Sequence, residues 1–239
     1  MPGYNEMTEE DKAKYTAKFE ALIAEGSTDE EAIAVLQQPQ LLVKVIKVEE
    51  LMIEIELAVA EGKTPLVVDS SESDIVNKFF TYQTVALLDG KKMGLDKSMK
   101  KIPVPDIMEE ARSKLVFAIK TGIPFVIAMT KSVTDFVETF NDTIAKENHE
   151  LGGEGAFLPI EMFDKAGKTL LADEKMEALF REKDREDIAG VAVSKNPDGF
   201  YVVLTTQFTE EDYEDYLFGN NWGLPKPKDK YKALLVRAS

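Results

Sequence analysis

The sequence predicts an α/β protein with a five-stranded parallel sheet, helices on both faces of the sheet and a helical N-terminal extension. Two observations predict this fold. Five short and almost continuous apolar runs follow Gly62, as is typical of strands buried on both faces. Charged helical stretches separate these runs, as expected for crossover connections between parallel strands. We therefore expect residues 1–62 to form the helical extension and residues 63–239 to form the sheet domain.

The N-terminal extension is predicted to contain three helices. The first begins at a capping box of Thr8 and Asp11, and the second begins at Thr28 and ends before Pro39. The third is predicted over residues 41–60, where apolar side chains are dense. Five of these carry more apolar surface than a solvated helix can expose, so we expect this helix to dock on the sheet domain. They are Leu42, Val45, Ile46, Leu51 and Ile55.

The five apolar runs are predicted to be the strands of one parallel sheet. They comprise residues 65–69, 85–89, 124–129, 200–206 and 231–236. Because crossovers between parallel strands are right-handed, we expect the strand order 5-1-4-3-2, with the first strand in the centre. Helices are predicted to connect them at residues 73–80, 106–121, 134–146, 173–183 and 210–217.

The composition excludes several classes of function. The chain has 44 Asp and Glu residues against 29 Lys and Arg residues, a formal net charge of −15. Such a surface repels phosphate backbones and anionic lipids, so we expect neither nucleic acid nor membrane as a partner. The sequence contains no cysteine, and its single histidine, His149, lies in a polar helix end where we interpret it as a solvated cation. These counts exclude disulfides, thiolate zinc sites and paired-imidazole sites, and we expect no metal site.

The first residues show no signal peptide, and no uncharged apolar run is long enough to span a membrane. We therefore expect a soluble, cytoplasmic protein.

The loop after the first predicted strand is the first place to look for a ligand, because parallel sheets bind ligands at the carboxyl ends of their strands. It consists of Asp69, Ser70, Ser71, Glu72, Ser73 and Asp74. A phosphate-binding loop has the pattern G-x-x-x-x-G-K-[ST], in which glycines let backbone N–H groups contact the phosphate. This loop has no glycine, and its three carboxylates repel a polyphosphate. We interpret it as a structural turn.

Other short motifs carry little evidence for a site. The Gly-Lys-Thr triplet at residues 62–64 precedes a strand instead of following one, and the triplet at residues 167–169 lacks the leading glycine. The carboxylates at residues 210–215 are interpreted as a solvated helix start, with a cation site as the alternative. Asp89 ends the second predicted strand and suits either a helix cap or a magnesium site bound through water.

Three segments together resemble the AAA-type core of P-loop proteins: residues 61–69, 120–128 and 199–207. They are similar to the degenerate AAA modules of dynein heavy chains and to the C-terminal domain of proteins with IQ motifs and ankyrin repeats. In those families the first strand leads to the phosphate loop, the third carries a metal-binding acid and the fourth ends in a polar sensor residue. Thr205, Thr206 and Gln207 match the sensor position, but the third predicted strand ends without a carboxylate.

This resemblance implies a P-loop fold and a cytoskeletal or axonemal setting, and the altered phosphate loop favours a non-catalytic domain that binds a protein partner and no cofactor. We see no IQ motif or ankyrin repeat, so the chain's own residues do not support calmodulin as the partner. The alternative is a nucleotide-binding protein that uses Mg-ATP for weak ATPase or kinase-like phosphotransfer. Its contributors are Lys78, Asp89, Thr205 and Thr206. A third hypothesis is an acidic protein that responds to a cation.

Overall fold

The computed structural model describes residues 9–24, 26–29, 41–71, 73–141, 158–185, 197–219 and 222–237. The chain divides into two units, Met1–Gln40 and Leu41–Ser239. The first unit contains helix α1 (Glu9–Ala24), which confirms the first predicted helix. Nearly all of the second predicted helix lies outside the described residues, as do His149 and Glu72.

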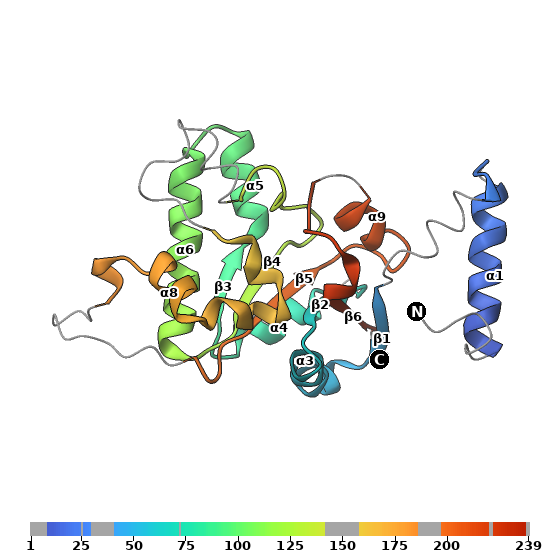
Figure 1. Ribbon diagram of the computed structural model, residues 1–239, viewed down its shortest axis with the longest axis horizontal. Helices are drawn as coiled ribbons and strands as arrows, with labels where there is room; N and C mark the ends of the chain where they lie inside the picture. Colours follow the sequence, from blue (N-terminus) through green and yellow to red (C-terminus); the bar gives the residue numbers. More distant parts are fainter. Residues whose placement is uncertain are drawn as a thin grey trace. The chain divides into compact units, whose positions relative to one another are not determined.

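A parallel sheet of six strands forms the centre of the second unit (Figure 1). The strands are β1 (Leu42–Ile46), β2 (Thr64–Asp69), β3 (Ala86–Asp89), β4 (Phe125–Ala128), β5 (Val202–Thr206) and β6 (Tyr231–Val236). Their order is β1-β6-β2-β5-β4-β3, and every neighbouring pair is parallel. The prediction of five strands is therefore corrected, because β1 adds a sixth strand at the edge beyond β6.

The prediction of one long helix over residues 41–60 is wrong. This segment forms β1, a 3-10 turn at Val48–Glu50 and helix α3 (Leu51–Ala60). All five residues of β1 pair with β6, from Leu42 opposite Lys232 to Ile46 opposite Val236. The branched residues of β1 favour a strand once a partner strand is available, and a dense apolar run cannot by itself distinguish the two structures. The segment belongs to the second unit, so the boundary between units falls at residue 40 and not at residue 62.

Helices cover both faces of the sheet, as predicted. Helices α3 and α4 (Ile75–Thr81) pack on one face, where Leu51 and Phe80 join a cluster with Val67 and Val203 of the strands. The other face carries α5 (Gly90–Ser98), α6 (Val104–Thr121), α8 (Asp173–Leu179), α9 (Tyr213–Phe218) and 3-10 segments at Ile160–Phe163 and Lys165–Leu171. None of the helices in the described part of the chain combines the length and apolarity that crossing a bilayer requires.

Several connecting helices differ from their predicted ranges. Helix α8 ends at Leu179, and α9 begins at Tyr213, three residues later than predicted. The described part of the helix predicted over residues 134–146 consists of turns, in which the Asp135 carboxylate accepts hydrogen bonds from the N–H groups of Val137 and Glu138. Helix α5 was not predicted, because its two glycines disfavour a helix.

A buried charged cluster holds the segment around residue 184 against α6. The Arg112 side chain is fully buried and donates hydrogen bonds to Glu109 (2.8 and 3.0 Å), to Asp184 (2.6 Å) and to the carbonyl of Leu179 (2.9 Å). Burial raises the pKa of Glu109, but hydrogen bonds from Arg112 and Lys183 lower it more strongly, to about 2. Burial also opposes ionisation of Asp184, but hydrogen bonds from Arg112 and the backbone of Arg181 lower its pKa. The carboxylates of Glu109 and Asp184 therefore stay ionised at neutral pH and neutralise the buried guanidinium.

Candidate functional site

The candidate site lies where the connections change from one face of the sheet to the other. The connection after β2 contains α4 on one face, whereas the connection after β5 contains α9 on the opposite face. Strands β2 and β5 are hydrogen-bonded neighbours. In open parallel sheets, ligands bind at the carboxyl ends of two such strands. The loop predicted as a degenerate phosphate-binding position therefore lies at the topological switch point.

Both oxygens of the Asp69 carboxylate at the end of β2 accept hydrogen bonds, from the loop that follows and from the start of α4. Asp69 is buried, and one carboxylate oxygen accepts hydrogen bonds from the N–H and the hydroxyl of Ser71. The other oxygen accepts the backbone N–H of Val76 in the first turn of α4, at 3.0 Å. N–H groups at a helix start are the donors that commonly bind phosphate. Here a carboxylate of the chain itself occupies one of them.

Side chains at the end of β5 and directly after it join this loop and helix α4 across the switch point. The Gln207 amide donates a hydrogen bond to Asp74, and the Thr205 hydroxyl donates to the Asn77 side chain at 3.1 Å. Asp74 precedes the first residue of α4 and has a positive φ of 54°, a conformation that Asp tolerates better than most residues. These contacts fix the two loops to each other. We call Asp69, Asp74, Asn77, Thr205 and Gln207 the latch.

The remaining loop residues also bind within the protein. The Ser70 hydroxyl lies 3.3 Å from the carbonyl of Val236 and 3.4 Å from Glu210, which forms a two-point ion pair with Arg237. Ser73 is exposed, and its carbonyl accepts a hydrogen bond from the Lys78 ammonium. Lys78 is thus the cation nearest in sequence to the loop, and it folds back onto the loop backbone.

The residues at the predicted sensor position, Thr205, Thr206 and Gln207, also form hydrogen bonds within the protein. Thr205 and Thr206 are buried, with 2% and 1% of their surface exposed. The Thr206 hydroxyl donates to the carbonyl of Thr130 at 3.0 Å, and the N–H of Gln207 donates to the same carbonyl at 2.9 Å. Both contacts connect the carboxyl ends of β5 and β4.

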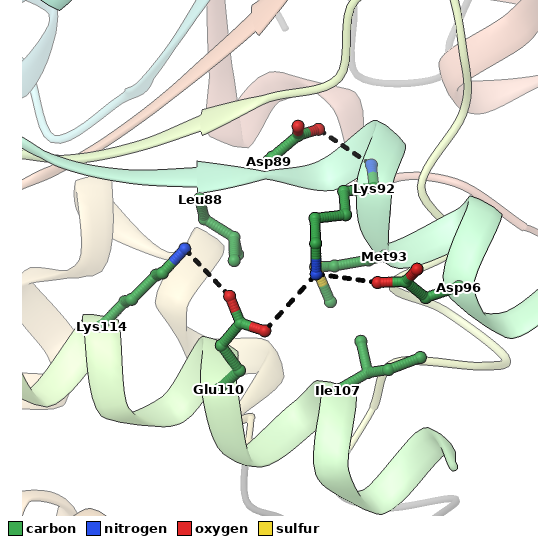
Figure 2. A pocket seen from close by; sticks show the side chains of 8 residues that line it. All are labelled: Leu88, Asp89, Lys92, Met93, Asp96, Ile107, Glu110 and Lys114. Carbon is green, nitrogen blue, oxygen red and sulfur yellow. Dashed lines mark hydrogen bonds and ion pairs between the residues drawn. The ribbon is translucent and has the colours of Figure 1, made fainter. Parts of the chain in front are cut away.

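Asp89 lies apart from the other proposed contributors, because β5 and β4 separate β3 from β2. Its carboxylate caps α5 by accepting the N–H of Lys92 at 2.8 Å, which agrees with the cap interpretation. Figure 2 shows the small hollow beside it, where the Lys92 ammonium lies 2.8 Å from Asp96 and 3.6 Å from Glu110. Lys114 pairs with Glu110 at 3.2 Å. The charged groups that line this hollow are paired with one another.

The structure brings Lys78, Thr205 and Thr206 to one end of the sheet and leaves Asp89 two strands away. Among the described residues, no group of three or more His, Cys, Asp or Glu side chains is arranged to hold a metal ion. Asn77 could not be predicted from the sequence, because its contact with Thr205 spans 128 residues of chain and has no local signal. The turn between Asp69 and Ser71 did have a local signal in the sequence, because an Asp side chain commonly accepts a hydrogen bond from the backbone N–H two residues further on.

No family model, curated protein or solved structure matches this chain. The geometry of the latch is therefore what indicates function in this chain. That geometry provides buried and half-buried polar groups that hydrogen-bond within the chain at the switch point, with neither a free nucleophile nor a free cation among the latch residues.

Proposed function

We propose that this chain is a non-catalytic P-loop-like module that acts by binding a protein partner and whose former phosphate-binding position serves as a structural latch. The observation that carries the proposal is the hydrogen bonding of Asp69, whose two carboxylate oxygens bind the loop and the first turn of α4. A phosphate at this position needs those donors. The chain itself already uses them.

Electrostatics supports the same conclusion. A nucleotide phosphate at this loop would lie close to the carboxylates of Asp69 and Asp74, with Glu210 nearby through Ser70. At an effective dielectric near 20, two like charges about 5 Å apart repel each other by about 3 kcal/mol before screening by salt. Lys78 provides one compensating charge, but its ammonium is bound to the carbonyl of Ser73.

A protein partner fits the charge of the molecule better than other partners. The net charge of −15 opposes binding to nucleic acid and to anionic membranes. The resemblance to degenerate AAA modules favours a cytoplasmic, cytoskeletal or axonemal partner. No cofactor is required by this proposal.

The alternative function is binding of Mg-ATP with weak hydrolysis or phosphotransfer. One observation favours it: Lys78, Thr205 and Thr206 lie together at the switch point. For this function the latch must open, because the Asp69 and Asp74 carboxylates must leave the start of α4.

Thermal unfolding with Mg-ATP, Mg-GTP or Mg-ADP distinguishes the two functions. We expect the same melting temperature with and without millimolar nucleotide. A nucleotide present at a hundredfold excess over its Kd would stabilise the protein by about 2.7 kcal/mol. A clear rise in melting temperature that disappears in the Lys78→Ala variant would overturn the non-catalytic proposal in favour of the alternative.

A further inference from the structure

Strand β1 forms an exposed apolar edge of the sheet. Among the described residues it pairs with β6 on one side only. Leu42, Val43 and Val45 are 48%, 51% and 49% exposed, although the sequence analysis expected Leu42 and Val45 to be covered. Unpaired edge strands are templates for pairing with another chain unless charge, proline or a covering element blocks them.

The backbone direction of β1 shows which groups face outward. The carbonyl of Ile46 accepts the N–H of Arg237, which follows β6, at 3.3 Å, so the backbone groups of Ile46 point toward β6. These directions alternate along a strand. The N–H and C=O groups of Val43 and Val45 therefore point to the open side of the sheet.

The side chains of β1 also divide between the two faces. Ile46 is buried with α3, and Lys44 forms an ion pair with Glu54 of α3 at 2.7 Å. Val43 and Val45 lie on the opposite face, because successive side chains alternate. The sequence of β1, Leu-Val-Lys-Val-Ile, is thus nearly symmetric about Lys44: a valine stands on each side of it, and a larger aliphatic residue follows each valine.

We propose that β1 pairs in antiparallel fashion with β1 of a second copy of this chain, about a two-fold axis at Lys44. In this register Val43 of each copy lies opposite Val45 of the other. The outward N–H and C=O groups of both valines then form hydrogen-bonded pairs. Leu42 lies opposite Ile46 on the other face. The two six-stranded sheets become one continuous sheet through a self-complementary contact.

The self-complementary residue pattern of β1 favours a second copy as the occupant, and the charges at the axis allow it. Two lysines directly opposite each other repel, which by itself disfavours this register. However, each Lys44 ammonium lies 2.7 Å from the Glu54 carboxylate of its own copy. The two-fold axis therefore brings together two Lys44–Glu54 ion pairs, one from each copy, whose charges cancel. Leu57 of α3, which is 46% exposed, lies one helical turn after Glu54 and extends the exposed apolar surface of β1.

Sedimentation equilibrium of the full chain over micromolar concentrations tests the proposal. We expect a monomer–dimer equilibrium. Val45→Pro removes one outward N–H and leaves the bonds to β6 in place, and proline is tolerated on an edge strand when its N–H side faces solvent. We expect this variant to fold and to shift the dimerisation constant at least tenfold toward monomer. Val43→Lys should do the same. Leu95→Lys, at an equally exposed position on α5, is the matched control and should dimerise normally.

Charge reversal tests the arrangement at the axis. Lys44→Glu places four carboxylates together and should yield monomer, whereas Lys44→Glu combined with Glu54→Lys restores a neutral ion pair in each copy and should restore the dimer. The proposal is overturned by a wild-type protein that remains monomeric throughout, by a dimer that survives both Val45→Pro and Val43→Lys, or by a folded double variant that stays monomeric.

Discussion

The carboxylate of Asp69 lies 3.0 Å from the backbone nitrogen of Val76, so the last residue of strand β2 caps the helix that follows it. The contact spans seven residues and makes the loop between them a closed unit. In a nucleotide-binding protein this position would be held open for the ligand. Here it contributes to the stability of the folded chain, which leads to the first prediction.

Replacing Asp69 with Ala should destabilise the protein by about 2–3 kcal/mol, because hydrogen bonds to a charged acceptor are worth more than neutral ones and their donors become unpaired. Urea denaturation measures the free energy of unfolding. Asp173→Ala, at an exposed position at the start of α8, is the control and should change it by less than about 0.5 kcal/mol. Equal effects of the two substitutions would show that Asp69 does not act as a cap.

Nucleotide binding should not appear when glycines alone are restored. Replacing the loop of residues 70–74 with a glycine-rich cradle that keeps Glu72 and Asp74 should give no heat of Mg-ATP binding in calorimetry. The carboxylates still repel phosphate, by about 3 kcal/mol for each like-charge pair near 5 Å. A second variant without Glu72 and Asp74 shows whether removing the charge is also sufficient. Tight binding by the glycine-only variant contradicts the electrostatic argument.

The buried charged cluster of Arg112, Glu109 and Asp184 should make the free energy of unfolding decrease at acid pH. The pKa of Glu109 is lowered from 4.5 to about 2 in the folded protein, so the unfolded chain takes up a proton first as the pH falls. This contribution to stability is fully present above about pH 4.5 and is lost as the pH falls toward 2. Glu109→Gln should therefore flatten the decrease in the free energy of unfolding over this range.

Urea denaturation at several pH values between 5 and 2 measures that slope. Glu138→Gln, at an exposed position, is the control and should leave the slope unchanged. Glu109→Gln should also lower stability at neutral pH by about 3 kcal/mol, because it weakens the pairing of the buried Arg112. A slope that Glu109→Gln does not alter would show that other carboxylates determine the acid sensitivity.

Two glycines should respond in opposite ways to substitution by alanine. A Cβ at Gly199 would collide with the carbonyl of Gly122, a backbone atom that cannot move aside, so Gly199→Ala should cost about 2 kcal/mol. A Cβ at Gly94, within α5, would meet nothing within 4 Å. Gly94→Ala should therefore stabilise by about 0.5–1 kcal/mol through helix propensity. Differential scanning calorimetry compares the two, and a stable Gly199→Ala variant would contradict the close approach.

The sequence predicted those parts of the fold that have a local pattern. The runs around Val67, Leu87 and Val203 are short, apolar and bounded by turns, so their strands could be found. The run around Val45 has the same composition, but it becomes a strand because β6 is available beside it, and each residue of β1 pairs with a residue 190 positions further along the chain. Long-range pairing of this kind leaves no local pattern to predict from.

The candidate site shows the same division. Its position at the end of β2 and its lack of glycine were visible in the sequence. The contacts that close it were not, because Thr205–Asn77 and Gln207–Asp74 join residues more than 120 positions apart. Each of these four side chains suits an exposed loop as well as a buried hydrogen bond. Only the fold brings them together.

The buried Asp69 also determines how this domain can respond to its surroundings. In a domain that binds and hydrolyses a nucleotide, the occupant of the switch point changes with each cycle, and the neighbouring loops change with it. An occupant that is covalently part of the chain cannot be released, diluted or consumed. Under the non-catalytic function proposed above, the surfaces around β2 and β5 should therefore keep one shape whatever the cellular ratio of ATP to ADP, and regulation of the proposed partner binding would come from the partner or from the amount of protein.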